Sequence, residues 1–153
     1  MLERYGDQTV VGGSWAVVTG ASDGIGAEFC RQLARDGFNI ALVSRTMSKL
    51  QAVERECKQI NPKIKTRIVQ ADFAGNANLP FYENLYRQLD DLDIAILINN
   101  AGVMNNGPLG EVEPKKLKDT IDVDVIHVAL FTNYFLPILL KRKSRGAIIN
   151  VGS

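Results

Sequence analysis

A glycine-rich turn, Thr19-Gly20-Ala21-Ser22-Asp23-Gly24-Ile25-Gly26, holds the residues best suited to bind a charged ligand. It follows the apolar run Trp15–Thr19 and precedes an amphipathic stretch, so it is predicted to join a strand to the N-terminus of a helix. In such turns glycines make the bend, let the backbone approach a pyrophosphate, and let helix and strand pack closely. The free N–H groups of the helix then face the anion. The turn predicts a dinucleotide-phosphate site; the alternative is a flexible loop with incidental glycines.

Six residues of this turn are the candidate cofactor ligands. Ser22 would add a side-chain donor, and Asp23 would cap the helix that follows. The six are Gly20, Ser22, Asp23, Gly24, Ile25 and Gly26. No metal site is expected, because the chain has a single histidine and its two cysteines, Cys30 and Cys57, lack the C-x-x-C spacing and are interpreted as reduced core thiols.

Short apolar runs alternate with amphipathic stretches along the chain, a pattern typical of βαβ units that build a parallel sheet. With right-handed crossovers, five strands and four helices predict an α/β Rossmann-like, doubly wound sheet of order 3-2-1-4-5. The strands are expected at Trp15–Thr19, Asn39–Ser44, Lys65–Gln70, Ile94–Asn99 and Ala147–Val151. The helices are expected from Ile25 to before Gly37, from Met47 to Ile60, around Tyr82–Leu89, and from Pro114 to about Leu140.

The composition is that of a globular chain without a strong charge field. The 153 residues are 46% hydrophobic and 23% charged, which excludes a disordered or low-complexity protein. Eighteen lysines and arginines against seventeen acids give a net charge of +1, so no nucleic-acid partner is expected.

Neither a signal peptide nor a membrane span is predicted. Met1–Gly13 is polar and contains glycine. The apolar stretch Val125–Leu140 is only 16 residues long and is interrupted by His127, Thr132, Asn133 and Pro137, so it is predicted to be a buried core helix. The basic run 141–145 is interpreted as its solvated end.

The spacing Thr-Gly-x-x-x-Gly-x-Gly resembles the short-chain dehydrogenase/reductase family. Asn99-Asn100-Ala101-Gly102 matches the family's second turn, and Asp72, followed by Phe73, closes the third strand where the family places an acid near the adenine. The resemblance implies cofactor contacts at Asp72, Phe73, Asn99, Ala101 and Gly102. It implies one dinucleotide-binding domain over residues 14–153, preceded by an N-terminal extension, 1–13, and lacking the family's later strands. Tyr5-Gly6, Ser44-Arg45 and 145–150 look most like the hydroxysteroid and very-long-chain 3-ketoacyl-CoA reductase branch.

The end of the second strand favours NADP(H) over NAD. An acid there would bind the ribose hydroxyls and repel a 2′-phosphate, whereas an arginine pairs with that phosphate. This chain has Ser44-Arg45 and no carboxylate at that point, so Arg45 is the expected contact and Lys49 a second one. The alternative is that both are solvated charges at a helix start.

The resemblance also implies ketone reduction by hydride transfer, with a tyrosine, a lysine four residues later and a serine. Ser153 matches the serine, but none of the chain's four tyrosines has lysine four residues on. Asp124 stands where the family has an asparagine in a proton relay, and a charge buried there would be costly. Asp122 and Asp124 are not expected to act as a pair, because residues two apart do not share a helix face. His127 is interpreted as a core or groove side chain.

Two functions remain open from the sequence. The chain is either the cofactor-binding part of an NADP-dependent reductase of fatty-acyl or steroid-like hydrophobic ketones, expected not to turn over alone, or a short non-catalytic relative in a larger assembly. A homo-oligomer or protein partner would use the long helix 114–141 and the edge of strand 147–151. The resemblance implies association with the endoplasmic reticulum membrane; a complete N-terminus would instead imply the cytoplasm.

Overall fold

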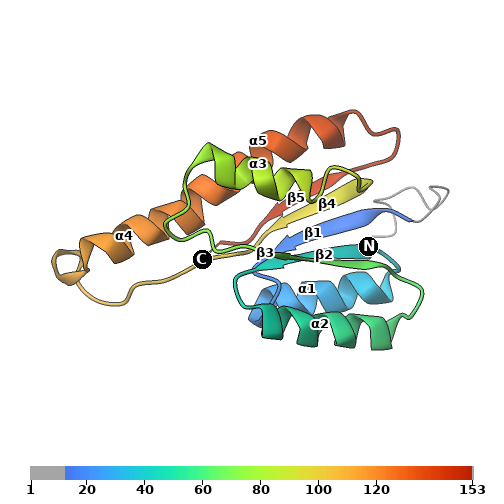
Figure 1. Cartoon of the computed structure of the whole chain (residues 1–153), viewed down its shortest axis with the longest axis horizontal. Helices are drawn as coiled ribbons and strands as arrows, with labels where there is room; N and C mark the ends of the chain where they lie inside the picture. Colours follow the sequence, from blue (N-terminus) through green and yellow to red (C-terminus); the bar gives the residue numbers. More distant parts are fainter. Residues whose placement is uncertain (1–12, 153) are drawn as a thin grey trace.

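A computed structural model describes residues 13–152 of the chain. Five parallel strands form one sheet in the order β3-β2-β1-β4-β5, which confirms the predicted topology (Figure 1). The strands are β1 (Trp15–Thr19), β2 (Asn39–Ser44), β3 (Thr66–Gln70), β4 (Ile94–Asn99) and β5 (Ala147–Asn150). Residues 1–12 of the predicted N-terminal extension lie outside the described residues. Ser153, the predicted catalytic serine, lies outside them as well.

Helices cover both faces of the sheet. Figure 1 shows α1 (Gly24–Arg35) and α2 (Met47–Ile60) on one side, and α3 (Leu79–Arg87) and α5 (His127–Leu140) on the other. The short helices α4 (Pro114–Ile121) and η2 (Leu109–Glu111) complete the set, and α4 is joined to α5 by a π-helical turn, η3 (Asp122–Ile126). The layers are those of a doubly wound α/β fold.

The core consists of two layers, one on each side of the sheet. Every residue of the three central strands, β1, β2 and β4, is buried. Strands buried on both faces read as continuous apolar runs, which is why their bounds were predictable. Cys30 and Cys57 are buried and free in the layer under α1 and α2, and burial raises the pKa of Cys57 to about 11. The central strands therefore form a rigid base for the loops at their carboxyl ends.

The apolar face of α2 is buried only in the middle of that helix. Leu50, Val53 and Cys57 are buried, whereas Met47 and Ile60 are 37% and 36% exposed. Both lie at the ends of the helix, where no neighbouring element covers them completely.

The long helix differs from the prediction in two ways. It is not a single α-helix, because η3 interrupts it, and it is a core helix on one face only. Phe131, Phe135 and Leu139 are buried against the sheet, while apolar side chains on the other face are exposed. By length and composition the run Pro114–Leu140 is long and apolar enough to cross a membrane, and 28% of its most apolar stretch is buried inside the fold. The exposed apolar side chains of this run include Leu117, Ile121, Val125, Leu136, Ile138 and Leu140.

Candidate functional site

A pocket of about 460 Å³ opens at the carboxyl ends of β1 to β4. This is the edge at which open α/β sheets bind their ligands. Eleven of the predicted cofactor residues line it: Gly20, Ser22, Asp23, Gly24, Ile25, Arg45, Lys49, Asp72, Phe73, Ala101 and Gly102. It is also lined by Ser44, Thr46, Ala71, Asn100, Val103 and Val123, which were not predicted as ligands.

The glycines of the β1–α1 turn do different work. A Cβ built on Gly26 would lie 2.2 Å from the Gly20 carbonyl oxygen, so Gly26 allows α1 to pack on β1 and does not itself line the pocket. Gly24 has φ +53° and a Cβ there would meet nothing within 4 Å, although Gly24 lines the pocket. The space next to its backbone is therefore open to a ligand, as the close approach of a pyrophosphate requires.

The start of α1 presents its N-terminus to this space. Asp23 caps the helix, and its Oδ1 accepts a hydrogen bond of 2.8 Å from the Gly24 N–H. Ser22 Oγ lies 2.8 Å from Ser44 Oγ, which ties the turn to the end of β2. The residues present thus fit an anionic dinucleotide: a helix N-terminus, an open glycine backbone and hydroxyl groups.

Two cationic side chains, Lys49 and Arg45, line the pocket, and only Lys49 is paired with an acid among the described residues. Lys49 Nζ lies 2.7 Å from Asp23 Oδ2, and this hydrogen bond, with that from the Gly24 N–H, holds the pKa of Asp23 below its usual range. The guanidinium of Arg45 forms no ion pair within residues 13–152, and only its backbone carbonyl is engaged, by Gln70 Nε2 at 2.9 Å. Of these two cations, Arg45 is therefore the one without an acid partner among the described residues.

A tight turn after β3 forms the next wall. Asp72 Oδ1 accepts a hydrogen bond of 3.1 Å from the Ala74 N–H, and Phe73 is buried. The ring of Phe73 stacks on that of His127, with centroids 4.1 Å apart. The aromatic side chain is thus fixed from the α5 side while Asp72 stays exposed at the pocket.

The turn after β4 is locked to β1. Thr19 Oγ1 accepts hydrogen bonds of 3.0 Å from the N–H groups of Asn100 and Ala101, and Asn100 Nδ2 donates to the Thr19 carbonyl at 3.0 Å. Asn99 does not line the pocket; its Nδ2 donates to Thr132 Oγ1 and Asn150 Oδ1 and so joins β4 to α5 and β5. Asn100, the neighbouring asparagine of the same motif, is the one at the site.

The long helix meets the site through its π-helical turn. Asp124 is exposed and accepts a hydrogen bond of 2.9 Å from the Val103 N–H, so its charge is not buried in a relay. The buried acid is Asp122, whose contacts are with a different loop, as expected for residues two apart. His127 is fully buried: Nδ1 lies 3.0 Å from the Val123 carbonyl, Nε2 has no partner within residues 13–152, and burial lowers its pKa to about 4.

Curated relatives carry one common description. The chain is 47% identical over 143 residues to a very-long-chain 3-oxoacyl-CoA reductase of Coccidioides immitis, a match that covers 92% of this chain and 40% of the relative. It is 42% identical over 154 residues to a protein of the same description from Pyricularia oryzae, covering 99% of this chain and 45% of the relative. The chain thus spans less than half the length of these relatives.

Several solved structures of short-chain dehydrogenases resemble this chain, and a family model matches it. A 7β-hydroxysteroid dehydrogenase superposes with a TM-score of 0.83 at 26% identity, covering 99% of this chain and 55% of that one. A short-chain dehydrogenase from Sphingobium yanoikuyae in complex with NADPH gives 0.81 at 27% identity, covering 92% and 54%. A metagenomic short-chain oxidoreductase in complex with NADP gives 0.76 at 33%, covering 92% and 62%. Because residues 14–153 match the short chain dehydrogenase family, the chain belongs to that family.

Proposed function

We propose that this chain binds NADP(H) for an oxidoreductase that reduces the ketone of a 3-oxoacyl-CoA. One observation supports the choice of cofactor: Arg45, which has no acid partner within residues 13–152, stands at the end of β2 and lines the same pocket as the open backbone of Gly24. An acid at this place would favour NAD, whereas a guanidinium pairs with a 2′-phosphate in a bidentate manner.

Each wall of the pocket has a part in binding. The N-terminus of α1 and the Gly24 backbone receive the pyrophosphate, Arg45 receives the 2′-phosphate, and Asp72 and Phe73 border the adenine. Lys49 is a second phosphate ligand once it leaves Asp23. When bound, the cofactor supplies the hydride, and the protein's residues orient it and exclude water.

The names of the relatives support the choice of substrate. Both fungal proteins described above are named very-long-chain 3-oxoacyl-CoA reductases, and they match nearly all of this chain. For the protein isolated from its natural source, we expect NADPH consumption, followed as loss of absorbance, to require a 3-oxoacyl-CoA and to increase with acyl length. A preference for a steroid ketone would contradict this part of the proposal.

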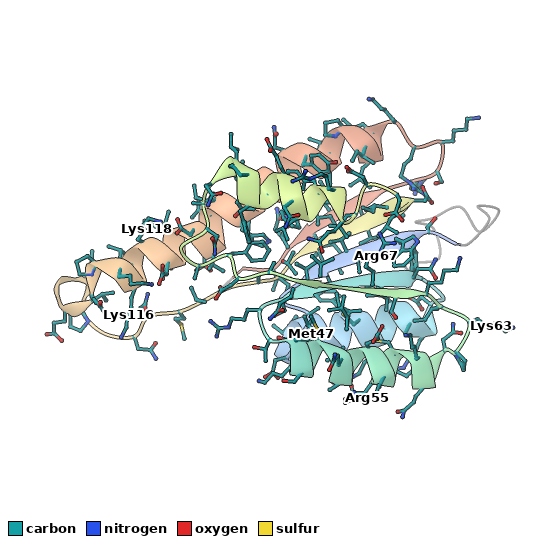
Figure 2. The ribbon with its side chains drawn as sticks, viewed as in Figure 1. Met47, Arg55, Lys63, Arg67, Lys116 and Lys118 are labelled. Carbon is teal, nitrogen blue, oxygen red and sulfur yellow. The ribbon has the colours of Figure 1, made fainter. Side chains whose placement is uncertain are left out.

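Calorimetric titration of the purified chain tests the cofactor. NADPH should bind more tightly than NADH, and Arg45→Ala should weaken NADPH by about tenfold or more, since a charged hydrogen bond is lost, while leaving NADH within about twofold. Arg55→Ala is the matched control, because Arg55 is an exposed arginine on the outer side of α2, away from the sheet (Figure 2). Tighter binding of NADH, or NADPH binding unchanged by Arg45→Ala, would refute NADP selection. If neither NADPH nor NADH binds, the non-catalytic alternative is favoured.

We also propose association with the endoplasmic reticulum membrane, in keeping with a very-long-chain acyl substrate. The exposed apolar residues of the run Pro114–Leu140 offer a surface for a protein partner or for lipid. Fractionation of cells that make the natural protein tests the location: recovery of the protein in the cytosolic supernatant would contradict it.

A further inference from the structure

The turn after β3 is a small unit held together by its own hydrogen bonds. Asp72 Oδ1 accepts from the Ala74 N–H, the Phe73 carbonyl accepts from the Asn76 N–H at 3.2 Å, and the Asp72 carbonyl accepts from Asn76 Nδ2 at 2.9 Å. Gly75 has φ +73°, a left-handed conformation that this tight turn requires of a glycine. Because the turn is internally bonded, holding one of its residues restrains the others.

One buried carboxylate holds this unit from outside. Asp122, in η3, is 3% exposed, and its Oδ2 accepts a hydrogen bond of 3.1 Å from the Gly75 N–H. The same oxygen lies 2.6 Å from Lys118 Nζ, one turn earlier on α4 (Figure 2). A buried charge is tolerated only when it is paired and hydrogen-bonded, and these two donors meet that need.

The π-helical turn accounts for this placement. Its first three residues make three different contacts: Asp122 bonds the β3 turn, Val123 lines the pocket, and Asp124 bonds Val103 in the β4 loop. Single π-helical turns inside α-helices occur often at functional sites. Here the turn connects the helix to two of the loops that border the cofactor pocket, those after β3 and β4.

We propose that Asp122 is a positioning residue for the cofactor: by holding Gly75, it keeps Asp72 and Phe73 in the conformation that borders the adenine. The inference rests on the proposed function, because it assigns the turn to the cofactor. Packing on His127 already restrains Phe73, so the hydrogen bond to Gly75 acts mainly on the exposed Asp72 side of the turn.

Two substitutions separate positioning from mere structural support. Asp122→Asn keeps an acceptor for the Gly75 N–H and should bind NADPH within about twofold of the wild type. Asp122→Ala removes the acceptor, so the turn must be ordered on binding, and NADPH should bind about fivefold more weakly. Asp36→Asn is the control, since Asp36 is an exposed acid at the C-terminal end of α1, at the end of that helix opposite the pocket.

Calorimetry at a temperature at which every variant is folded gives the affinities, and hydrogen–deuterium exchange follows the Gly75 and Asn76 amides. Faster exchange at these amides in Asp122→Ala alone, together with weaker binding, supports the proposal. Equal NADPH affinity in Asp122→Ala and wild type overturns it and leaves the proposed function standing. Absence of NADPH binding to the wild type overturns both.

The wild type also provides a test that needs no variant. Saturating NADPH should slow exchange at the Gly75 and Asn76 amides, because a ligand against the turn suppresses its opening. Unchanged exchange at both amides in the bound protein overturns the proposal even if Asp122→Ala does not fold.

Discussion

Two glycines with the same backbone conformation and different surroundings allow ligand space to be separated from chain stability. Gly24 and Gly37 have φ of +53° and +83°, and a Cβ at either would meet nothing within 4 Å. Gly24 lines the pocket, whereas Gly37 follows α1 at its far end. Alanine at either position therefore places a Cβ on a left-handed backbone, but only alanine at position 24 occupies space in the pocket proposed for the cofactor.

The expected magnitudes follow from these conformations. A left-handed non-glycine residue costs about 1–2 kcal/mol, and the lower entropy of the unfolded chain with alanine returns about 0.4–1 kcal/mol. Gly24→Ala and Gly37→Ala should thus each lower the free energy of unfolding by about 1 kcal/mol. A methyl group between the Gly24 backbone and a phosphate is an overpacked contact, so NADPH should bind to Gly24→Ala at least about tenfold more weakly.

Gly26→Ala provides the third member of the series. Its Cβ would lie 2.2 Å from the Gly20 carbonyl oxygen and 2.5 Å from Asn100 Nδ2, and the carbonyl is backbone that cannot simply rotate away. We expect a loss of about 3 kcal/mol in the free energy of unfolding, with weaker binding as a consequence of the displaced turn.

Urea unfolding gives the stabilities and calorimetry with NADPH gives the affinities. The reasoning is refuted if Gly24→Ala binds NADPH as tightly as the wild type, or if Gly37→Ala loses affinity to the same extent as Gly24→Ala. In the first case the open space at Gly24 is not where the phosphate lies. In the second, binding depends on overall stability alone.

Two further outcomes follow from the charges. Asp23→Asn preserves an N-cap but frees Lys49 from its ion pair. The dissociation constant of NADPH should therefore fall by up to about fivefold at low salt and return to the wild-type value at high salt, while that of NADH stays unchanged. An equal gain in affinity for NADH would contradict this reasoning. Burial lowers the pKa of His127 to about 4, below its unfolded value, so the unfolded chain takes up the proton first. Stability should therefore be complete above about pH 6.5 and fall by about 3 kcal/mol towards pH 4, and His127→Leu should flatten this dependence in unfolding measured across that range.

The strands were predictable to within one residue because each central strand is buried on both faces. An uninterrupted apolar run bounded by polar turns then has one sensible assignment, as for β1 and β4. The π-helical turn was not predictable, since the apolar spacing around Val123 and Ile126 is compatible with a continuous α-helix. In the structure, Asp122 and Asp124 of this turn contact two separate loops that are remote in the sequence.

The site shows the same division. Gly20 and Arg45 could be found from the sequence because each directly follows a strand, and Gly24 because it begins the helix after β1; parallel strands bring their carboxyl ends to one edge. The choice between Asn99 and Asn100 could not be made, because adjacent residues of one motif differ only in the direction of their side chains: one points to Thr132, the other to Thr19. Residues that bind through their position along a strand are therefore visible in the sequence.

Residues that hold the binding loops are not visible in this way. Asp122 is separated by 47 residues from the glycine it bonds, and the lysine four residues before it, Lys118, which Asp124 lacks, does not reveal that contact. Burial separates the two: a carboxylate that is 3% exposed must have its partners nearby, and those partners identify the loop it serves. Periodicity places Asp122 and Asp124 on the same helix but does not show which of them is buried. The burial of Asp122 is what links the long helix to the turn after β3, beside the pocket.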